Sequence, residues 1–304
     1  MLIMTMISPV FHRPDIVRRR LLTAMLLAPW CFPLHGRSSA PEIGRIVALE
    51  WLPVELLMAL GVTPFGVADV HHYRQWVNAP VLPDNVIDVG LRTEPNLELL
   101  ARLRPSLLLY SAGYGPSPEQ LSTIAPSLSI AFSDGGNPLQ VARASLVSLA
   151  ATLGLGDAAE RHLTLFAQFM QQARIRLQPY THRPLLMFSV VDDRHVVVIG
   201  KNSLFQNVLD QLDIENAWQG ETNFWGSAVV GIEQLATVSN ANAICFDHGN
   251  DSQMLRLAAS PLWQAMPFIR ARRCQRVEPV WFYGATLSAM RLCRVLERAM
   301  ENAS

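Results

Sequence analysis

The stretch 98–110, Glu-Leu-Leu-Ala-Arg-Leu-Arg-Pro-Ser-Leu-Leu-Leu-Tyr, returns further along the chain at 233–246 as Glu-Gln-Leu-Ala-Thr-Val-Ser-Asn-Ala-Asn-Ala-Ile-Cys-Phe. The two copies align without a gap, and a helix-breaking Pro105 or Asn240 precedes an apolar run in each. Each copy therefore predicts a short helix, a turn and a buried strand. Such a unit can also recur by chance. A true repeat predicts two similar α/β lobes, with a ligand bound where the lobes meet.

Strand and helix patterns alternate around the repeat. The chain shows the patterns of a strand, a helix and a strand at 45–49, 53–60 and 62–67, and this alternation is typical of a parallel sheet. We expect an N-terminal α/β lobe at 41–155 and a C-terminal α/β lobe at 181–304, each a mostly parallel sheet with flanking helices.

One long helix is predicted between the lobes, at 156–180. The run 158–178 has no Gly or Pro, and its apolar residues recur at helical spacing until Pro179 ends it. A helix of this length rises about 30 Å, enough to cross from one lobe to the other. A rigid crossing limits hinge closure and predicts a shallow cleft between the lobes.

The first 40 residues have the pattern of an export signal. The basic run 18–20 precedes the apolar run 21–28, which is shorter than the about 20 residues that a membrane span needs. The pattern favours twin-arginine export and the periplasm, with Sec export and an uncleaved anchor as alternatives. Three cysteines remain after the signal, Cys245, Cys274 and Cys293, so at most one disulfide can form.

Charge and motifs argue against several functions. The 304 residues carry 25 basic and 25 acidic side chains without a basic patch, which argues against a nucleic-acid partner. The chain has no His-Glu-x-x-His motif, phosphate loop or nucleophile elbow, so we expect no enzyme. The adjacent pair His71 and His72 is the only histidine cluster, and such pairs are more often solvated than metal-bound.

Aromatic residues in loops indicate a binding site. Large rings beside Gly and Asn at strand ends are typical of a shared apolar cleft, although each ring alone can equally cap the core. These rings are Trp76, Tyr114, Trp218, Trp225, Trp281 and Tyr283. Arg92 lies in an insertion that the second copy lacks, and it can present a fork of N–H donors to oxygen ligands. A surface salt bridge of Arg92 with Glu94 or Glu98 is the alternative.

Five segments, 49–55, 90–98, 111–118, 216–226 and 281–290, closely resemble the periplasmic iron(III)-hydroxamate (ferrichrome-type siderophore) binding proteins. These are ABC-importer substrate-binding proteins with a helical backbone between two α/β lobes. The resemblance implies a carrier of ferric hydroxamates such as ferrichrome, coprogen and ferrioxamine. It also implies ligand contacts at Trp76, Arg92, Tyr114, Trp218, Asn223, Trp225, Ser227, Trp281 and Tyr283.

The chemistry of the implied ligand agrees with the residues. Three hydroxamates give iron six oxygen ligands, so the protein needs neither metal ligands nor a cofactor of its own. The resemblance implies that Arg92 and Tyr114 hydrogen-bond the hydroxamate oxygens. A nearly neutral complex suits one arginine, whereas a highly charged complex calls for a cluster. A carrier of cobalamin or haem, a metal-ion carrier using His71 and His72, and an exported enzyme are the alternatives.

The partners follow from the same resemblance. The glutamate that opens the equivalent helix of each lobe docks onto arginines of an inner-membrane ABC permease, which a cytoplasmic ATPase drives. Glu98 and Glu233 match that place, and Glu119 is a substitute for Glu98. Glu98 and Glu233 are also explained as carboxylates favoured by a helix N-terminus. We expect a monomer.

Overall fold

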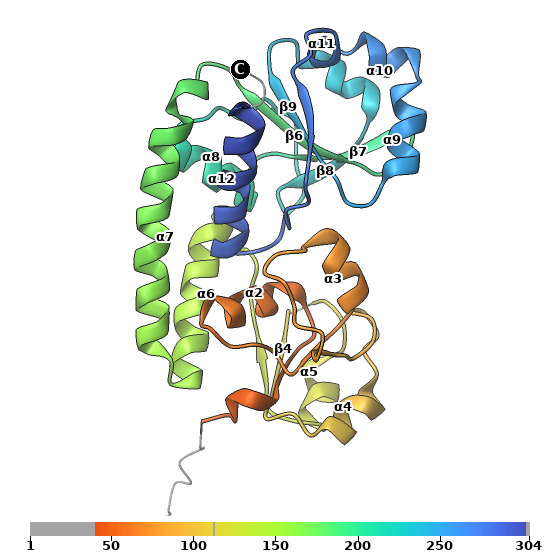
Figure 1. Cartoon of the computed structure of the whole chain (residues 1–304). Coiled ribbons are helices and arrows are strands. Elements are labelled where there is room, and N and C mark those ends of the chain that lie inside the picture. Colours follow the sequence, from red (N-terminus) through yellow and green to blue (C-terminus); the bar gives the residue numbers. More distant parts are fainter. Residues whose placement is uncertain (1–39, 112, 302–304) are drawn as a thin grey trace, which may run out of the picture. The chain divides into compact units, whose positions relative to one another are not determined.

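Two five-stranded sheets organise residues 40–111 and 113–301, the part of the chain that this computed structural model describes (Figure 1). The predicted export signal lies, except for Ala40, outside these described residues. The prediction of two α/β lobes joined by a long helix is confirmed.

The first sheet is wholly parallel, with the strand order β3-β2-β1-β4-β5. Its central strands are continuous apolar runs, as expected for strands covered on both faces. The strands are β1 (Ile46–Ala48), β2 (Gly66–Val67), β3 (Ile87–Asp88), β4 (Leu107–Tyr110) and β5 (Ser127–Ser129). The helices that connect or follow them are α2 (Trp51–Ala59), α3 (Val70–Trp76), α4 (Leu97–Leu103), α5 (Pro118–Ser122) and α6 (Pro138–Leu153), and the 3-10 turn η2 (Ile43–Arg45) precedes β1.

The second sheet has the order β10-β9-β6-β7-β8. Four strands run in the same direction, while β7 runs antiparallel to both its neighbours, β6 and β8. The strands are β6 (Leu185–Val190), β7 (His195–Ile199), β8 (Ser227–Gly231), β9 (Asn242–Phe246) and β10 (Cys274–Val277). The helices around them are α8 (Leu204–Leu212), η4 (Ile232–Thr237), α9 (Asp251–Ala258), α10 (Pro261–Ala265), α11 (Pro267–Arg270) and α12 (Thr286–Glu301).

The repeated phrase forms a helical turn and a strand in both lobes, but the helices differ. In the first copy Asn96 caps α4 by accepting a hydrogen bond from the Leu99 N–H at 2.9 Å. In the second copy Gly231 precedes η4 and provides no side-chain cap, and the segment winds as a 3-10 helix. A missing cap leaves the first N–H groups of a helix without partners, which favours a short, tight turn.

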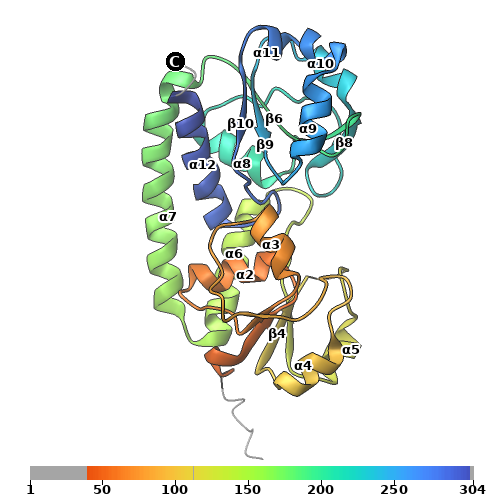
Figure 2. The ribbon, with the colours of Figure 1, turned by 45° about the vertical axis from the view of Figure 1, so that its right-hand side comes forward.

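The helix α7 (Gly156–Leu177) runs along both lobes, beside α12, before the short turn η3 (Gln178–Tyr180) (Figures 1 and 2). Ala159 packs into the core of the first lobe, while Phe166 and Met170 pack into the core of the second. One continuous helix therefore contributes to two hydrophobic cores and braces them against each other.

A buried carboxyl group forms a second connection between the lobes. Glu55 of α2 accepts hydrogen bonds from the Ser288 N–H at 2.8 Å and the Ser288 hydroxyl at 2.6 Å, in the first turn of α12. The His162 ring of α7 lies 2.7 Å from the Thr286 hydroxyl. Desolvation by burial raises the pKa of Glu55 above its usual range, although the hydrogen bonds from Ser288 oppose this shift.

The raised pKa of Glu55 predicts a pH-dependent stability. The folded protein binds this proton more tightly than the unfolded chain, whose pKa lies near 4.5. The stabilisation is therefore complete below pH 4.5 and is lost as the pH rises through the higher pKa of the folded state. Glu55→Gln keeps an uncharged side chain of the same shape. The free energy of unfolding of this variant, measured by urea titration, should increase relative to that of the wild type. The increase should reach up to about 1.4 kcal/mol for each pH unit in this window. A difference that stays constant with pH would contradict the prediction, and Glu160→Gln on the exposed face of α7 is the matched control.

Candidate ligand-binding site

A cavity of about 260 Å³ lies between the lobes. Its wall on the first lobe combines polar and apolar side chains, whereas its wall on the second lobe is aromatic. The lining residues are Glu50, Leu52, Arg92, Ser111, Tyr114 and Phe132 from the first lobe, and Trp225, Trp281 and Tyr283 from the second.

The lining residues of the first lobe follow the carboxyl ends of parallel strands. Glu50 comes after β1, Arg92 after β3, Ser111 and Tyr114 after β4, and Phe132 after β5. The carboxyl ends of parallel strands meet at one edge of a sheet, and ligands of open α/β sheets bind outside this edge. The topology therefore brings residues that are far apart in sequence to one side of the cavity.

Arg92 is held by two interactions. Its Nη1 donates a hydrogen bond to the Glu50 carboxylate, and its guanidinium carbon lies 3.6 Å from the ring centre of Trp51. Asp69 lies behind it, with Oδ2 3.8 Å from the Arg92 Nε. The predicted alternatives of a salt bridge with Glu94 or Glu98 do not occur, because Glu50 takes the guanidinium. The side chain is thus fixed in the cavity wall before a ligand arrives.

Aromatic rings from both lobes enclose the rest of the cavity. Trp281 packs edge-on against Tyr283 at 5.2 Å, and Trp225 lies 5.8 Å from Tyr283. Phe132 reaches across from the first lobe to within 5.3 Å of Trp225 and 5.5 Å of Tyr283. Tyr114 and Trp225 are 37% and 38% exposed, so these two rings are the accessible part of the wall.

Two predicted contact residues position the aromatic wall. The Asn223 side-chain oxygen accepts hydrogen bonds from the Trp225 N–H at 2.9 Å and the Ser227 N–H at 3.2 Å. The Ser227 hydroxyl is buried and lies 3.0 Å from the Tyr283 hydroxyl. Burial raises the pKa of Tyr283, so its hydroxyl stays protonated and can donate or accept a hydrogen bond.

Trp76 lies beside the cavity and not in its wall. Its ring stacks on His248 of the second lobe at 4.3 Å and meets Trp281 edge-on at 6.5 Å. The neighbouring Gln75 donates a hydrogen bond to the His248 carbonyl at 2.8 Å. Desolvation lowers the pKa of His248 to about 4, so the ring is neutral at pH 7. Trp76 therefore supports Trp281 and joins the lobes at the same time.

Trp218 lies in the core of the second lobe. The residue is 7% exposed, packs with Phe188 and its neighbours, and is not among the residues that line the cavity. Its ring covers Gly200 and Gly220, where no larger side chain fits. Of the nine predicted contacts, the structure brings five to the cavity wall: Arg92, Tyr114, Trp225, Trp281 and Tyr283.

Four lining residues were not predicted: Glu50, Leu52, Ser111 and Phe132. The first three lie inside segments that carry the family resemblance, at the ends of strands, which is a signal that could have identified them. Phe132 follows a short edge strand and has no comparable signal.

The three predicted docking carboxylates are exposed and lie in first helical turns. Glu98 lies in α4, Glu119 in α5 and Glu233 in η4. Hydrogen bonds from the backbone and Ser117 lower the pKa of Glu119. Glu98 and Glu119 thus belong to helices that follow the parallel strands β3 and β4, and neither residue lines the cavity.

Other features of the described residues carry no comparable site. Between 40–111 and 113–301 no group of three His, Cys, Asp or Glu side chains is arranged to hold a metal ion. Cys245, Cys274 and Cys293 are free thiols. No helix in this part of the chain combines the length and the apolar character that a membrane crossing requires.

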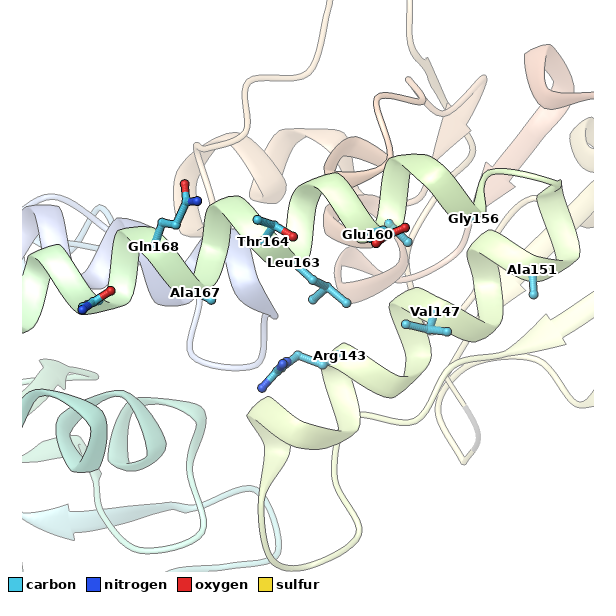
Figure 3. Close-up of a pocket in the computed structure, with 11 residues that line it drawn as sticks. Arg143, Val147, Ala151, Gly156, Glu160, Leu163, Thr164, Ala167 and Gln168 are labelled. Atoms are coloured by element: carbon cyan, nitrogen blue, oxygen red, sulfur yellow. The ribbon is translucent and has the colours of Figure 1, made fainter.

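A wider groove of about 700 Å³ runs between α6 and α7 (Figure 3). Figure 3 shows Arg143, Val147 and Ala151 of α6 on one side and Leu163 of α7 on the other. None of the predicted aromatic residues lines it, and it is a surface groove between two neighbouring helices. The smaller cavity between the lobes is therefore the candidate site.

Comparisons with known proteins agree with this fold. The iron(3+)-hydroxamate-binding protein FhuD of Escherichia coli (strain K12) is 56% identical over 288 residues, which cover 94% of this chain and 97% of that protein. The crystal structure of FhuD from Vibrio cholerae with bound Fe3+-Desferal is 30% identical, with a TM-score of 0.77 over 84% of this chain and 97% of that one. The triscatecholate siderophore-binding protein FeuA of Bacillus subtilis, at 13% identity and a TM-score of 0.68 over 87% of this chain and 94% of that one, shares the fold. The family model described as "Periplasmic binding protein" matches residues 46–278, and the chain belongs to this family.

Proposed function

We propose that the protein is a periplasmic carrier that captures ferric hydroxamate siderophores and delivers them to an inner-membrane ABC importer. The observation that supports this most directly is a fixed arginine inside an otherwise largely aromatic cavity. The relative from Escherichia coli is named for the same ligand class. As a member of a family of binding proteins, the chain is not an enzyme, in agreement with its lack of catalytic motifs.

The cavity suits the chemistry of a ferric trihydroxamate. Iron is already coordinated by six oxygens, so recognition falls to hydrogen-bond donors for those oxygens and to apolar surface for the carbon framework. Arg92 supplies charge-assisted donors, and the Tyr114 hydroxyl can add one more. Trp225, Trp281 and Tyr283 offer the apolar surface. Partial exposure of Tyr114 and Trp225 leaves room for frameworks of different size.

In this proposal the remaining predicted residues affect the ligand indirectly, because they hold side chains of the cavity wall in place. Asn223 and Ser227 orient Trp225 and Tyr283, and Trp76 supports Trp281. The contact assigned to Trp218 by resemblance is an indirect one, through the packing of the second lobe. In this proposal the lobes span 41–155 and 181–304, and the connecting helix spans 156–180. A signal at 1–40 directs the chain to the periplasm. The carrier acts there as a monomer.

Intrinsic fluorescence tests the ligand class. Three tryptophans in or beside the cavity, Trp76, Trp225 and Trp281, should be quenched by a ferric chelate. We expect ferrichrome and ferrioxamine B to quench the wild type at micromolar concentration or below, and the iron-free siderophores to quench it less. Quenching by cobalamin or haem alone, or by free metal ions alone, would contradict the proposal.

A matched pair of tryptophan variants locates the site. Trp225→Phe removes an exposed ring of the cavity wall, so it should weaken binding and reduce the quenching amplitude. Trp263→Phe removes a buried ring in the core of the second lobe and should leave the affinity unchanged. Equal effects of the two substitutions would place the ligand elsewhere.

A further inference from the structure

A second pocket, of about 320 Å³, lies beside α12 and is rich in arginine. It is lined by Ala79 and Pro80 from the first lobe and by Glu278, Leu287, Arg291, Arg294 and Arg298 from the second. Three guanidinium groups and one carboxylate leave this lining with a formal charge of +2. The pocket shares no lining residue with the candidate siderophore cavity, so we treat it as a separate feature of the molecule.

The three arginines form a row along one face of α12. Arg291, Arg294 and Arg298 are spaced by three and four residues, which places their side chains next to one another on a helix. The opposite face carries Leu292 and Leu296, which are buried in the core of the second lobe. Like charges at this spacing repel each other and destabilise a helix. An anion bound in the pocket would offset this repulsion.

The single carboxylate of the pocket compensates only part of this charge. Glu278 accepts a hydrogen bond from the Arg291 Nη2 at 2.8 Å through its Oε2, and its Oε1 pairs with the Arg298 Nη2. Within the described part of the chain Arg294 forms no ion pair, and its guanidinium carbon lies 4.8 Å from the ring centre of Phe169. One carboxylate shared by two arginines therefore leaves Arg294 without a negative partner.

The surroundings of the pocket hold its donors in place and occupy nearby acceptors. The Arg291 Nε donates a hydrogen bond to the Pro279 carbonyl at 2.9 Å, and this arginine side chain is only 15% exposed. On the side of the first lobe, the Pro80 carbonyl accepts a hydrogen bond from the Tyr73 hydroxyl at 2.6 Å. Both carbonyl groups thus already have a donor. Arg291 is oriented before a ligand arrives, which reduces the entropy that binding costs.

We propose that this arginine pocket binds a tetrahedral oxyanion of the phosphate class, either free phosphate or the phosphate of a lipid headgroup, at a site separate from that of the siderophore. A guanidinium fork donates two parallel hydrogen bonds to phosphate oxygens, and a tetrahedral anion has enough oxygens for more than one fork. A carboxylate has only two oxygens and satisfies a single fork. The inference does not depend on the proposed function, because the two sites share no residue.

Titration with inorganic phosphate at constant ionic strength, in a chloride buffer, tests the site. Isothermal titration calorimetry should show saturable binding of phosphate to the wild type. Arg294→Gln should raise the Kd at least about tenfold, because it removes charge-assisted hydrogen bonds. Arg161→Gln is the matched control, since it removes the same charge from an exposed position of α7 outside the pocket, and its Kd should equal that of the wild type. An equal increase of the Kd in both variants would refute the site.

The carboxylate of the pocket gives a test of opposite sign. Glu278→Gln removes the only negative charge of the lining, so it should lower the phosphate Kd by about threefold. A Kd that is unchanged or higher would contradict the charge balance on which the inference rests. If this variant does not fold, Arg298→Gln, whose side chain is 63% exposed, should raise the Kd by a smaller factor than Arg294→Gln. An unchanged Kd in Arg298→Gln would again refute the arginine row as the binding element.

Vesicles distinguish the two sources of the phosphate group. The wild type and Arg294→Gln are sedimented with phosphatidylcholine vesicles that contain or lack phosphatidylglycerol. If a lipid headgroup is the ligand, the wild type should sediment with the phosphatidylglycerol vesicles and Arg294→Gln should lose this binding. Saturable binding of inorganic phosphate, with equal sedimentation of the two proteins, would identify the free ion as the ligand. Binding of neither inorganic phosphate nor phosphatidylglycerol vesicles by the wild type would overturn the inference.

Discussion

Replacing Arg92 by Ala is expected to weaken the binding of a neutral ferric hydroxamate by about a hundredfold. The substitution removes the charge-assisted donors of the cavity, and each such hydrogen bond contributes about 1.5–3 kcal/mol. It also leaves the Glu50 carboxylate without its partner in a wall where that side chain is 11% exposed. Fluorescence titration with ferrichrome measures the loss.

The same substitution should lower the thermal stability, which has to be separated from the loss of affinity. Removing one partner of a buried ion pair costs about 3–5 kcal/mol, and this pair, being partly exposed, should cost less. Titrations should therefore be made at a temperature at which circular dichroism shows that the variant is folded.

Arg74→Ala is the matched control, because Arg74 lies in α3 and its ion pair with Asp84 is exposed. Arg92→Lys keeps the charge without the planar fork, so its affinity should lie between those of the wild type and Arg92→Ala. An affinity of Arg92→Ala equal to that of the wild type would remove the arginine from the site.

The architecture could be predicted because local patterns determine it. The gap-free repeat, the apolar strands and the 22-residue helix α7 are all properties of neighbouring residues. The carboxyl ends of parallel strands then meet at one edge, which explains why Arg92 and Tyr114 could be assigned to a common cleft before any contact was known.

Contacts between distant residues could not be predicted in the same way. Trp218 and Trp225 lie in the same aromatic loop, yet Trp218 is buried in the core against Gly200 and Gly220 while Trp225 faces the cavity, a difference that only the packing of the second lobe decides. The sequence offers Glu94 and Glu98 as the nearest acidic partners of Arg92, whereas the fold supplies Glu50, 42 positions away. Local charge spacing gives no information on which strand end lies next to which.

The links between the lobes also depend on distant pairs. Glu55 caps α12 from a helix more than two hundred residues earlier in the chain, and His248 stacks on Trp76 across the interface. Together with α7 these contacts tie the lobes at several points, so large hinge closure on ligand binding would have to break buried hydrogen bonds. The long helix alone predicts a shallow cleft. These contacts between the lobes, which the sequence pattern of the helix does not predict, support the same conclusion.

Exchanging both Glu98 and Glu233 for Lys is expected to abolish uptake of iron from ferrichrome and to leave its binding unchanged. The two carboxylates are exposed, each in the first helical turn of its copy of the repeat, and neither lines the cavity. If the permease presents arginines to them, the double substitution turns two attractions into repulsions, and like charges across an interface cost both affinity and association rate. Uptake of radioactive iron by cells that depend on this carrier measures the loss, and each single substitution should reduce uptake less than the pair.

Controls distinguish docking from a general effect of charge. Glu160→Lys makes the same change on the exposed face of α7, away from the repeated phrase, and should transport normally. Pairing Glu119→Lys with Glu233→Lys asks whether Glu119 of α5 takes the docking role in the first lobe instead. If that pair blocks uptake while Glu98→Lys with Glu233→Lys does not, the docking residue is Glu119. A loss of ferrichrome binding in either pair would show that these carboxylates support the site, because a docking residue on the permease-facing surface has no reason to change the affinity of a cavity that it does not touch.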